Sequence, residues 1–192
     1  TKVTVSFDVS MKDFPKKKVV LIGNPVREKI IVSDVEQAKK HFNLEEGLPA
    51  VLIMGGSLGA AKLNEVVFEA VPELVNNAQI IHVTGKGQLI EWVDNDKFGE
   101  KATMYHSLEY LYDEIVHAYA VADLIICRAG MSTLTELTAL NKPMVIVPIP
   151  DNQQEENALY YDSKNSIILL DQKTLTADQL VTIVRGLLSN PN

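Results

Sequence analysis

The motif Gly-Gly-Ser-Leu-Gly-Ala at residues 55–60 is the stretch best suited to chemistry, because it joins an apolar run to a helical pattern. Glycines let the backbone approach a ligand closely and reach positive φ. The unpaired N–H groups and the dipole of the following helix favour an anion at this position. Ser57 adds a hydroxyl donor. Gly55, Gly56, Ser57 and Gly59 therefore predict a phosphate-binding loop, although a tight turn without a ligand has the same composition.

The spacing of these glycines excludes the two commonest nucleotide fingerprints. The dinucleotide pattern G-x-G-x-x-G is not met, and no acidic residue ends the next strand to hold a ribose. The stretch Gly85-Lys86-Gly87 lacks both the upstream glycine and the following Ser or Thr of a P-loop. The phosphate expected here belongs to another type of ligand.

A second glycine-bearing turn, with the sequence CRAGMSTLTEL, also follows an apolar strand and begins a helix. Thr133 and Glu136 fit the S/T-x-x-E capping box, which explains both residues without a ligand. Two such helix starts at one sheet edge could instead hold a diphosphate without a metal. Glu136, expected in the first turn of the helix, could then accept hydrogen bonds from ribose hydroxyls. Gly130 belongs to this loop.

Two further polar turns could contribute to a site. In GNPVREKI, Arg27 is a permanent, fork-shaped donor, although a salt bridge with Glu28 or another neighbour is the simpler explanation. In PIPDNQQEENA, Gln153, Gln154 and Asn157 could read sugar hydroxyls, and a polar helix start explains them equally well.

Metal sites and disulfides are not expected. Asp94-Asn95-Asp96 has the D-x-D spacing of some metal-dependent transferases, but it follows a helical stretch and is interpreted as a surface turn. The single cysteine, Cys127, ends an apolar strand and is interpreted as a small buried hydrophobe. The four histidines are dispersed without metal-ligand spacing.

The elements that must position these loops alternate regularly. Continuous apolar strands such as VLIM, LIIC and MVIV are typical of parallel strands covered on both faces. The alternation predicts an α/β fold with a doubly wound, Rossmann-like parallel sheet, which binds ligands beyond the carboxyl ends of its strands. The expected strands are Val3–Phe7, Val19–Ile22, Ala50–Met54, Gln79–Val83, Ala102–Tyr105, Leu124–Cys127, Met144–Val147 and Ile167–Leu170. The expected helices are Ala60–Val75, Tyr112–Val121, Ser132–Leu140, Gln153–Ser163 and Thr176–Leu188.

Composition narrows the classes of partner. The net charge of −7 over 192 residues disfavours nucleic acid, which requires a concentrated basic face. No apolar run reaches the length of a membrane span, and no signal peptide is visible. The chain begins with Thr1 and enters structure almost at once, which indicates a fragment or a processed chain.

Taken together and in this order, GNPVR, GGSLGA, ADLIICRAGMSTLTEL and NQQEENA resemble the MurG family. These bacterial transferases move N-acetylglucosamine from UDP to undecaprenyl-diphosphate-muramoyl-pentapeptide (lipid I), which makes lipid II for peptidoglycan. The resemblance covers nearly the whole chain and implies the C-terminal, donor-binding half of a GT-B fold. Residues 1–22 would then be a connecting segment from an N-terminal domain, and residues 23–192 the UDP-sugar donor-binding domain.

The resemblance also implies roles for individual residues. Arg27 and Ser57 would contact the diphosphate region of the donor, the backbone around Tyr112 would border the uracil, and Gln154 would contact the N-acetylglucosamine. Glu136 would bind the ribose hydroxyls. The helix start would wrap the diphosphate and ribose through Met131, Ser132, Thr133, Leu134, Thr135 and Glu136. Met131-Ser132-Thr133 departs from the Ala-Leu-Thr or similar opening of the family.

The implied activity is that of an inverting hexosyltransferase without a metal or other cofactor, whose catalytic residue the sequence does not identify. Its partners would be UDP-N-acetylglucosamine and, through the N-terminal domain, lipid I. The protein would be cytoplasmic, and the full-length form peripheral on the cytoplasmic face of the membrane; the 192 residues alone would be inactive. One alternative is a nucleotide-sugar-binding subunit that needs a separate acceptor-binding protein. Another is half of a UDP-N-acetylglucosamine epimerase, although the loops offer few of the acids and histidines it needs.

Overall fold

The computed structural model describes residues 1–31, 34–56, 60–88 and 99–189. Its main sheet has six strands in the order β5-β4-β3-β6-β7-β8, and every pairing is parallel. Counted along the sheet, this is the order 3-2-1-4-5-6 of doubly wound folds, so the expected fold class is confirmed. The strands are β3 (Ala50–Met54), β4 (Gln79–Val83), β5 (Tyr105–Leu108), β6 (Leu124–Cys127), β7 (Met144–Ile146) and β8 (Ile168–Leu169).

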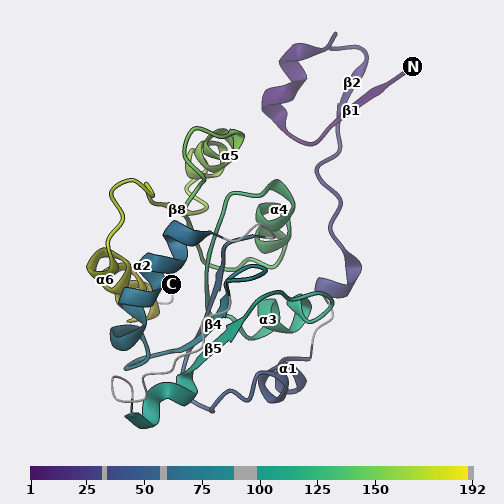
Figure 1. Ribbon diagram of the computed structural model, residues 1–192. Coiled ribbons are helices and arrows are strands. Elements are labelled where there is room, and N and C mark those ends of the chain that lie inside the picture. Colours follow the sequence, from purple (N-terminus) through teal and green to yellow (C-terminus); the bar gives the residue numbers. More distant parts are fainter. Residues whose placement is uncertain (32–33, 57–59, 89–98, 190–192) are drawn as a thin grey trace.

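Helices cover both faces of this sheet (Figure 1). One face packs against α2 (Ala61–Leu74) and α6 (Ala177–Ser189). The other packs against α1 (Val35–His41), α3 (Ile115–Val121), α4 (Met131–Ala139) and α5 (Gln153–Asp162). Alternate side chains of β3 therefore enter opposite cores: Val51 and Ile53 one, Leu52 and Met54 the other. This double burial is why the central strands are continuously apolar.

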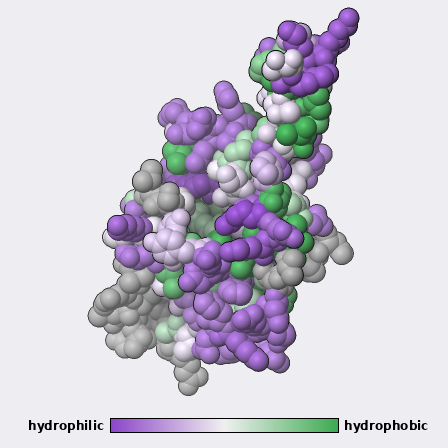
Figure 2. Space-filling model, turned by 90° about the vertical axis from the view of Figure 1, so that its right-hand side faces the viewer, coloured by the Kyte–Doolittle hydropathy of each residue, from purple (hydrophilic) through white to green (hydrophobic). Residues whose placement is uncertain are grey.

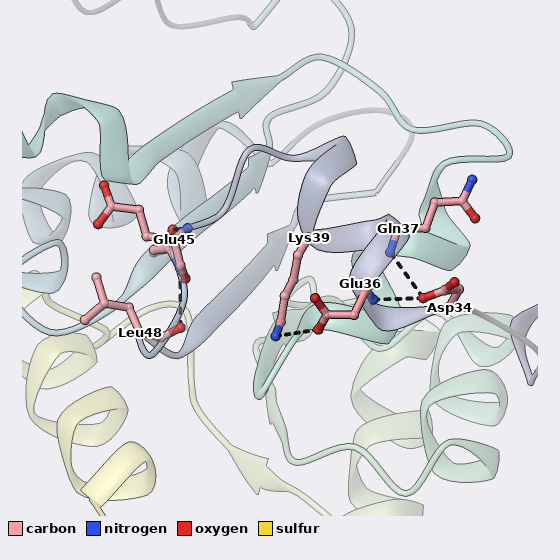
Figure 3. Close-up of polar contacts among 7 residues, drawn as sticks. Asp34, Glu36, Gln37, Lys39, Glu45 and Leu48 are labelled. Atoms are coloured by element: carbon pink, nitrogen blue, oxygen red, sulfur yellow. Dashed lines mark hydrogen bonds and ion pairs between the residues drawn. The ribbon is translucent and has the colours of Figure 1, made fainter.

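Several helices begin with side-chain caps. Asp34 accepts hydrogen bonds from the backbone N–H groups of Glu36 and Gln37 at the start of α1 (Figure 3). At the start of α6, the hydroxyl of Thr176 accepts from the N–H of Gln179 at 3.3 Å, which confirms the predicted cap. These caps fix the positions at which loops give way to helices.

One expected element is wrong, and one helix was not expected. Residues Ala102–Tyr105 are not a strand: Gly99–Met104 form the 3-10 helix η3, and β5 begins at Tyr105. Ala102 and Met104 pack against the α2 core from this short helix, and a short apolar run does not distinguish the two conformations. Helix α1 was not expected, because its seven residues carry a single buried side chain, Ala38.

Residues 1–22 form a small unit of their own. Strands β1 (Val3–Val5) and β2 (Val19–Leu21) pair in parallel, and the 3-10 helix η1 (Asp8–Asp13) lies between them. Figure 2 shows this unit projecting from the rest of the molecule, with apolar residues on its surface. Two residues of this unit contact Tyr160 of α5. The rings of Phe7 and Tyr160 have their centroids 5.1 Å apart, and the carboxylate of Asp8 accepts a hydrogen bond from the Tyr160 hydroxyl.

The unit leads through residues 22–27 to the short helix η2 (Glu28–Ile30). Within the described ranges, no helix has the length and apolarity needed to cross a bilayer.

Candidate functional site

A cavity of about 390 Å³ lies at the carboxyl ends of β3, β6 and β7. Because the strand order reverses between β3 and β6, this is the point at which doubly wound sheets bind their ligands. The two glycine-bearing loops expected to share a sheet edge meet here. The lining residues are Met54, Gly55, Gly56, Cys127, Arg128, Gly130, Met131, Ser132, Thr133, Ile149 and Gln154.

A larger cavity of about 640 Å³ opens at the opposite, amino end of the sheet, and its lining is mainly aliphatic. Three of its polar side chains already have partners. Lys39 pairs with Glu36, and the side chain of Gln79 bonds the backbone of Glu45 and Leu48 (Figure 3). Asp123 accepts from the N–H of Ala50. The chemistry therefore favours the smaller cavity.

Helix α4 directs its N-terminus at this smaller cavity. Gly130 is the N-cap, and the N–H of Leu134 is the first to bond within the helix, to the Gly130 carbonyl at 3.0 Å. The N–H groups of Met131, Ser132 and Thr133 have no partner inside the helix by its geometry. Three free donors and the positive end of the helix dipole therefore border the cavity.

The capping box, offered as the alternative explanation of Thr133 and Glu136, is wrong. The N-cap is Gly130, which makes no side-chain cap, and the helix begins at Met131. Thr133 is thus the third residue of α4 and Glu136 the sixth, so Glu136 is not in the first turn either. The helix begins two residues before the hydroxyl that the pattern took as the cap. Thr133 instead lines the cavity.

Arg128 also lines the cavity, although it was not among the predicted site residues. It is only 8% exposed, and its Nη1 donates to the carbonyls of Val147 and Pro148 at 2.9 and 3.2 Å. Its Nη2 donates to Oε1 of Gln172 at 2.5 Å. Among the described residues, its Nε has no hydrogen-bond partner and the side chain forms no ion pair.

Burial lowers the pKa of Arg128, but a guanidinium stays charged at neutral pH. A buried cation without a carboxylate is costly unless an anion meets it. The available signal was an arginine directly after the apolar strand LIIC, at the ligand-binding end of the sheet.

Arg27 and Glu136 form a bidentate ion pair. Arg27 donates from Nε to Oε1 at 2.5 Å and from Nη2 to Oε2 at 2.9 Å. The side chain of Glu136 is 10% exposed and that of Arg27 is 54% exposed. The pKa of Tyr119 is raised mainly by burial and, to a smaller extent, by the charge of Glu136 and a hydrogen bond to it. Hydrogen bonding to Glu136 raises the pKa of Arg27.

A second bond runs beside this pair. Nδ2 of Asn24 donates to Oγ1 of Thr135 at 2.9 Å, and that hydroxyl donates to the Met131 carbonyl at 2.8 Å. The segment GNPVR is thus attached to α4 at two successive residues. The Thr135 hydroxyl donates one hydrogen bond and accepts another within the fold. None of Arg27, Thr135 and Glu136 lines the cavity.

Of the other predicted residues, one lines the cavity and two do not. Gln154 lines the cavity, and its Oε1 accepts from the N–H of Ile149 at 3.4 Å. The Leu134 side chain is completely buried in the core, so only its backbone could face a ligand. Tyr112 is 77% exposed outside the cavity, and its N–H donates to Glu114.

In the glycine loop, Gly56 has a φ of +90°, which favours glycine. Ser57 and Gly59 lie outside the described residues, as does the Asp94-Asn95-Asp96 turn. In the part of the chain that the structure describes, no three His, Cys, Asp or Glu side chains form a cluster suited to a metal.

Comparisons with known proteins agree with this geometry. Residues 50–192 match the glycosyltransferase family 28 C-terminal domain. A relative from Thermodesulfovibrio yellowstonii, named UDP-N-acetylglucosamine--N-acetylmuramyl-(pentapeptide) pyrophosphoryl-undecaprenol N-acetylglucosamine transferase, is 38% identical over 98% of this chain and 52% of its own length. A relative of the same name, numbered 2, from Bacillus anthracis is 36% identical over 99% of this chain and 53% of its own length.

Among solved structures, MurG from Acinetobacter baumannii superimposes with a TM-score of 0.68 at 27% identity, over 97% of this chain and 50% of that one. The resemblance to the MurG family is therefore confirmed, and the chain spans about half the length of the curated relatives it matches. The chain belongs to glycosyltransferase family 28 and contains the C-terminal domain of that family.

Proposed function

We propose that this chain is the donor-binding domain of a transferase that moves N-acetylglucosamine from UDP-N-acetylglucosamine to lipid I. The observation that carries the proposal is the buried, unpaired charge of Arg128 beside the free amides of α4. A diphosphate supplies the negative charge and the acceptor oxygens that this arrangement lacks. The transferase names of the relatives support the choice of ligand.

In this proposal, the N–H groups of Met131, Ser132 and Thr133 bind the diphosphate together with Arg128. Ser57 adds its hydroxyl, and Gln154 contacts the sugar. The backbone near Tyr112 borders the uracil.

Arg27 and Glu136 serve the same ligand. Each carboxylate oxygen of Glu136 accepts one hydrogen bond from Arg27. Because a carboxylate can accept about four hydrogen bonds, Glu136 can still accept hydrogen bonds from ribose hydroxyls. Nη1 of Arg27 makes no hydrogen bond within the described residues and is assigned to the diphosphate region.

The proposed reaction is an inverting displacement at the anomeric carbon of the sugar. The acceptor hydroxyl forms the new bond, loses its proton to a base and displaces UDP, which keeps the electron pair of the broken C–O bond. The amides of α4 and the guanidinium of Arg128 stabilise the charge that grows on the leaving diphosphate, since preorganised dipoles do so without reorganising solvent. No metal or other cofactor has a role in this proposal.

The rest of the longer protein would supply the base and bind lipid I. Residues 1–22 would belong with that part, because two parallel strands alone bury little and leave Val20, Leu21 and Ile22 exposed. Acting on a lipid acceptor would place the full-length protein on the cytoplasmic face of the membrane. No nucleic-acid partner is proposed.

Calorimetry with four ligands tests the proposal. UDP and UDP-N-acetylglucosamine should bind the 192-residue chain, UDP-glucose should bind more weakly than UDP-N-acetylglucosamine, and NAD should not bind. Sugar transfer to lipid I by this chain alone should be undetectable. Equal, weak binding of all four ligands would contradict the assignment to a UDP-sugar site.

A further inference from the structure

Gln172 is the side chain that fixes the outer end of Arg128. It lies in the turn 171–174 that follows β8, forty-four residues from Arg128 in sequence, and its Oε1 accepts from Nη2 at 2.5 Å. No signal in the sequence marks it, because the contact exists only once β8 lies beside β7.

The turn that carries Gln172 is itself firmly attached. The carboxylate of Asp171 accepts from the N–H of Lys173 at 2.8 Å, and the Asp171 carbonyl accepts from the N–H of Leu175. The Lys173 ammonium pairs with Asp151, in the loop after β7, at 3.3 Å. These contacts connect the turn that carries Gln172 to the loop after β7.

All the partners of Arg128 in the described residues are neutral. They are the carbonyls of Val147 and Pro148 and the amide oxygen of Gln172. Neutral acceptors orient a guanidinium and offset part of its burial cost, but they leave its charge uncancelled. A carboxylate at position 172 would give the same geometry and neutralise the charge.

We propose that Gln172 is a positioning residue that orients Arg128 while preserving its full charge for a diphosphate ligand. The inference rests on the proposed function, since it concerns the same cavity. This role explains why position 172 carries an amide rather than the carboxylate commonly paired with a buried arginine.

The test is the charge change Gln172→Glu, with Gln179→Glu as the matched control. Gln179 accepts from the N–H of Thr176 at the start of α6, where Glu also fits a capping box, so the control adds the same charge without disturbing the helix. Gln172→Ala removes the acceptor and leaves the charge of Arg128. Calorimetry with UDP and with inorganic pyrophosphate, at two salt concentrations, and thermal melting are measured for each.

The expected order of affinity for UDP is wild type, then Gln172→Ala, then Gln172→Glu, with the Glu variant weaker by about tenfold or more because the cavity loses its net charge. The Glu variant should have a melting temperature at or above that of the wild type. Its affinity for UDP should depend less on salt concentration. If Gln172 had only a structural role, both variants would instead have a lower melting temperature and a lower affinity for UDP. UDP affinity within twofold of wild type for Gln172→Glu, or a reversed order of the two variants, would overturn the inference.

Pyrophosphate separates this inference from the proposed function. If the wild type binds pyrophosphate but not UDP, the nucleotide assignment fails, and the order of the variants with pyrophosphate still decides the role of Gln172. If the wild type binds neither compound, both proposals are overturned.

Discussion

Glu136 is a nearly buried carboxylate that Arg27 holds in a bidentate ion pair. Arg27 is half exposed, so solvent screens its side of the pair and limits what the pair adds to stability. Tyr119 is buried, and after burial itself the charge of Glu136 raises the pKa of its hydroxyl. This arrangement is better suited to holding an acceptor in place for a ligand than to stabilising the fold.

Replacing Glu136 by Gln tests that reading. The variant keeps the size of the side chain and loses its charge, so UDP affinity should fall by about tenfold, as expected for loss of a charge-assisted acceptor, with little change in melting temperature. Glu73→Gln is the matched control, because Glu73 pairs with Arg185 on the α2–α6 side of the sheet. Calorimetry and thermal melting measure both effects. Lower melting with unchanged affinity would show a purely structural ion pair.

His82 predicts a pH dependence of stability. Its ring lies between the Tyr105 hydroxyl at 2.8 Å and Oδ1 of Asn64 at 3.1 Å, and burial lowers its pKa from 6.5 to about 4. The Nδ2 of Asn64 donates to the carbonyl of Thr84, so its Oδ1 accepts from Nε2–H and the folded ring is neutral.

The unfolded chain takes up this proton near pH 6.5 and the folded chain only near pH 4. The contribution of His82 is therefore complete above pH 6.5 and is lost as the pH falls towards 4, by on the order of 3 kcal/mol in all. Urea unfolding at pH 7.5 and pH 5 measures the loss. His82→Gln should flatten this dependence, whereas His41→Gln, at an exposed site, should not; an equally steep dependence in His82→Gln would refute the assignment.

At the scale of elements, the central strands were predictable and one edge strand, β5, was not. The ranges of β3, β4 and β6 agree residue for residue with the expectation, because strands covered on both faces leave an unbroken apolar run. Strand β5 lies at the sheet edge, where its side chains after Tyr105 are only partly buried, and its expected range was displaced by three residues.

Helix α1 depends on its cap. Seven residues are too few for a stable isolated helix, so Asp34→Ala should lower the free energy of unfolding by about 1 kcal/mol. Because α1 lies at the amino end of the sheet, UDP affinity should not change. Asp34→Asn, which can accept the same hydrogen bonds, is the control. Urea unfolding and calorimetry decide the matter, and a reduced affinity in Asp34→Ala would mean that α1 communicates with the cavity.

At the scale of the whole molecule, the meeting of two glycine loops was predictable because parallel strands bring their carboxyl ends to one edge. The contacts that complete the site were not. Arg27 and Glu136 are 109 residues apart, and Arg128 and Gln172 are 44 apart. No local sequence pattern indicates contacts between residues so far apart in the chain. For this reason Arg128 was not predicted as a site residue, and Arg27 was assigned other partners.

The two sheets should also differ in stability. In the described part of the chain, β1 and β2 form a two-stranded sheet, whereas β3 has a neighbour on each side. Hydrogen–deuterium exchange should therefore be fast at Val3–Val5 and Val19–Leu21 and slowest in β3, β4 and β6. Mass spectrometry of peptides measures this difference. Comparable protection of both sheets would show that residues 1–22 unfold only with the domain.

The attachment of Asn24 and Arg27 to successive residues of α4 has a mechanical consequence. The segment that leaves the N-terminal unit ends on the same helix whose first amides border the cavity. A force applied to that unit would reach the anion site along two short bonds, bypassing the sheet. By linkage, if ligand binding favours one position of that segment, the same position also strengthens ligand binding.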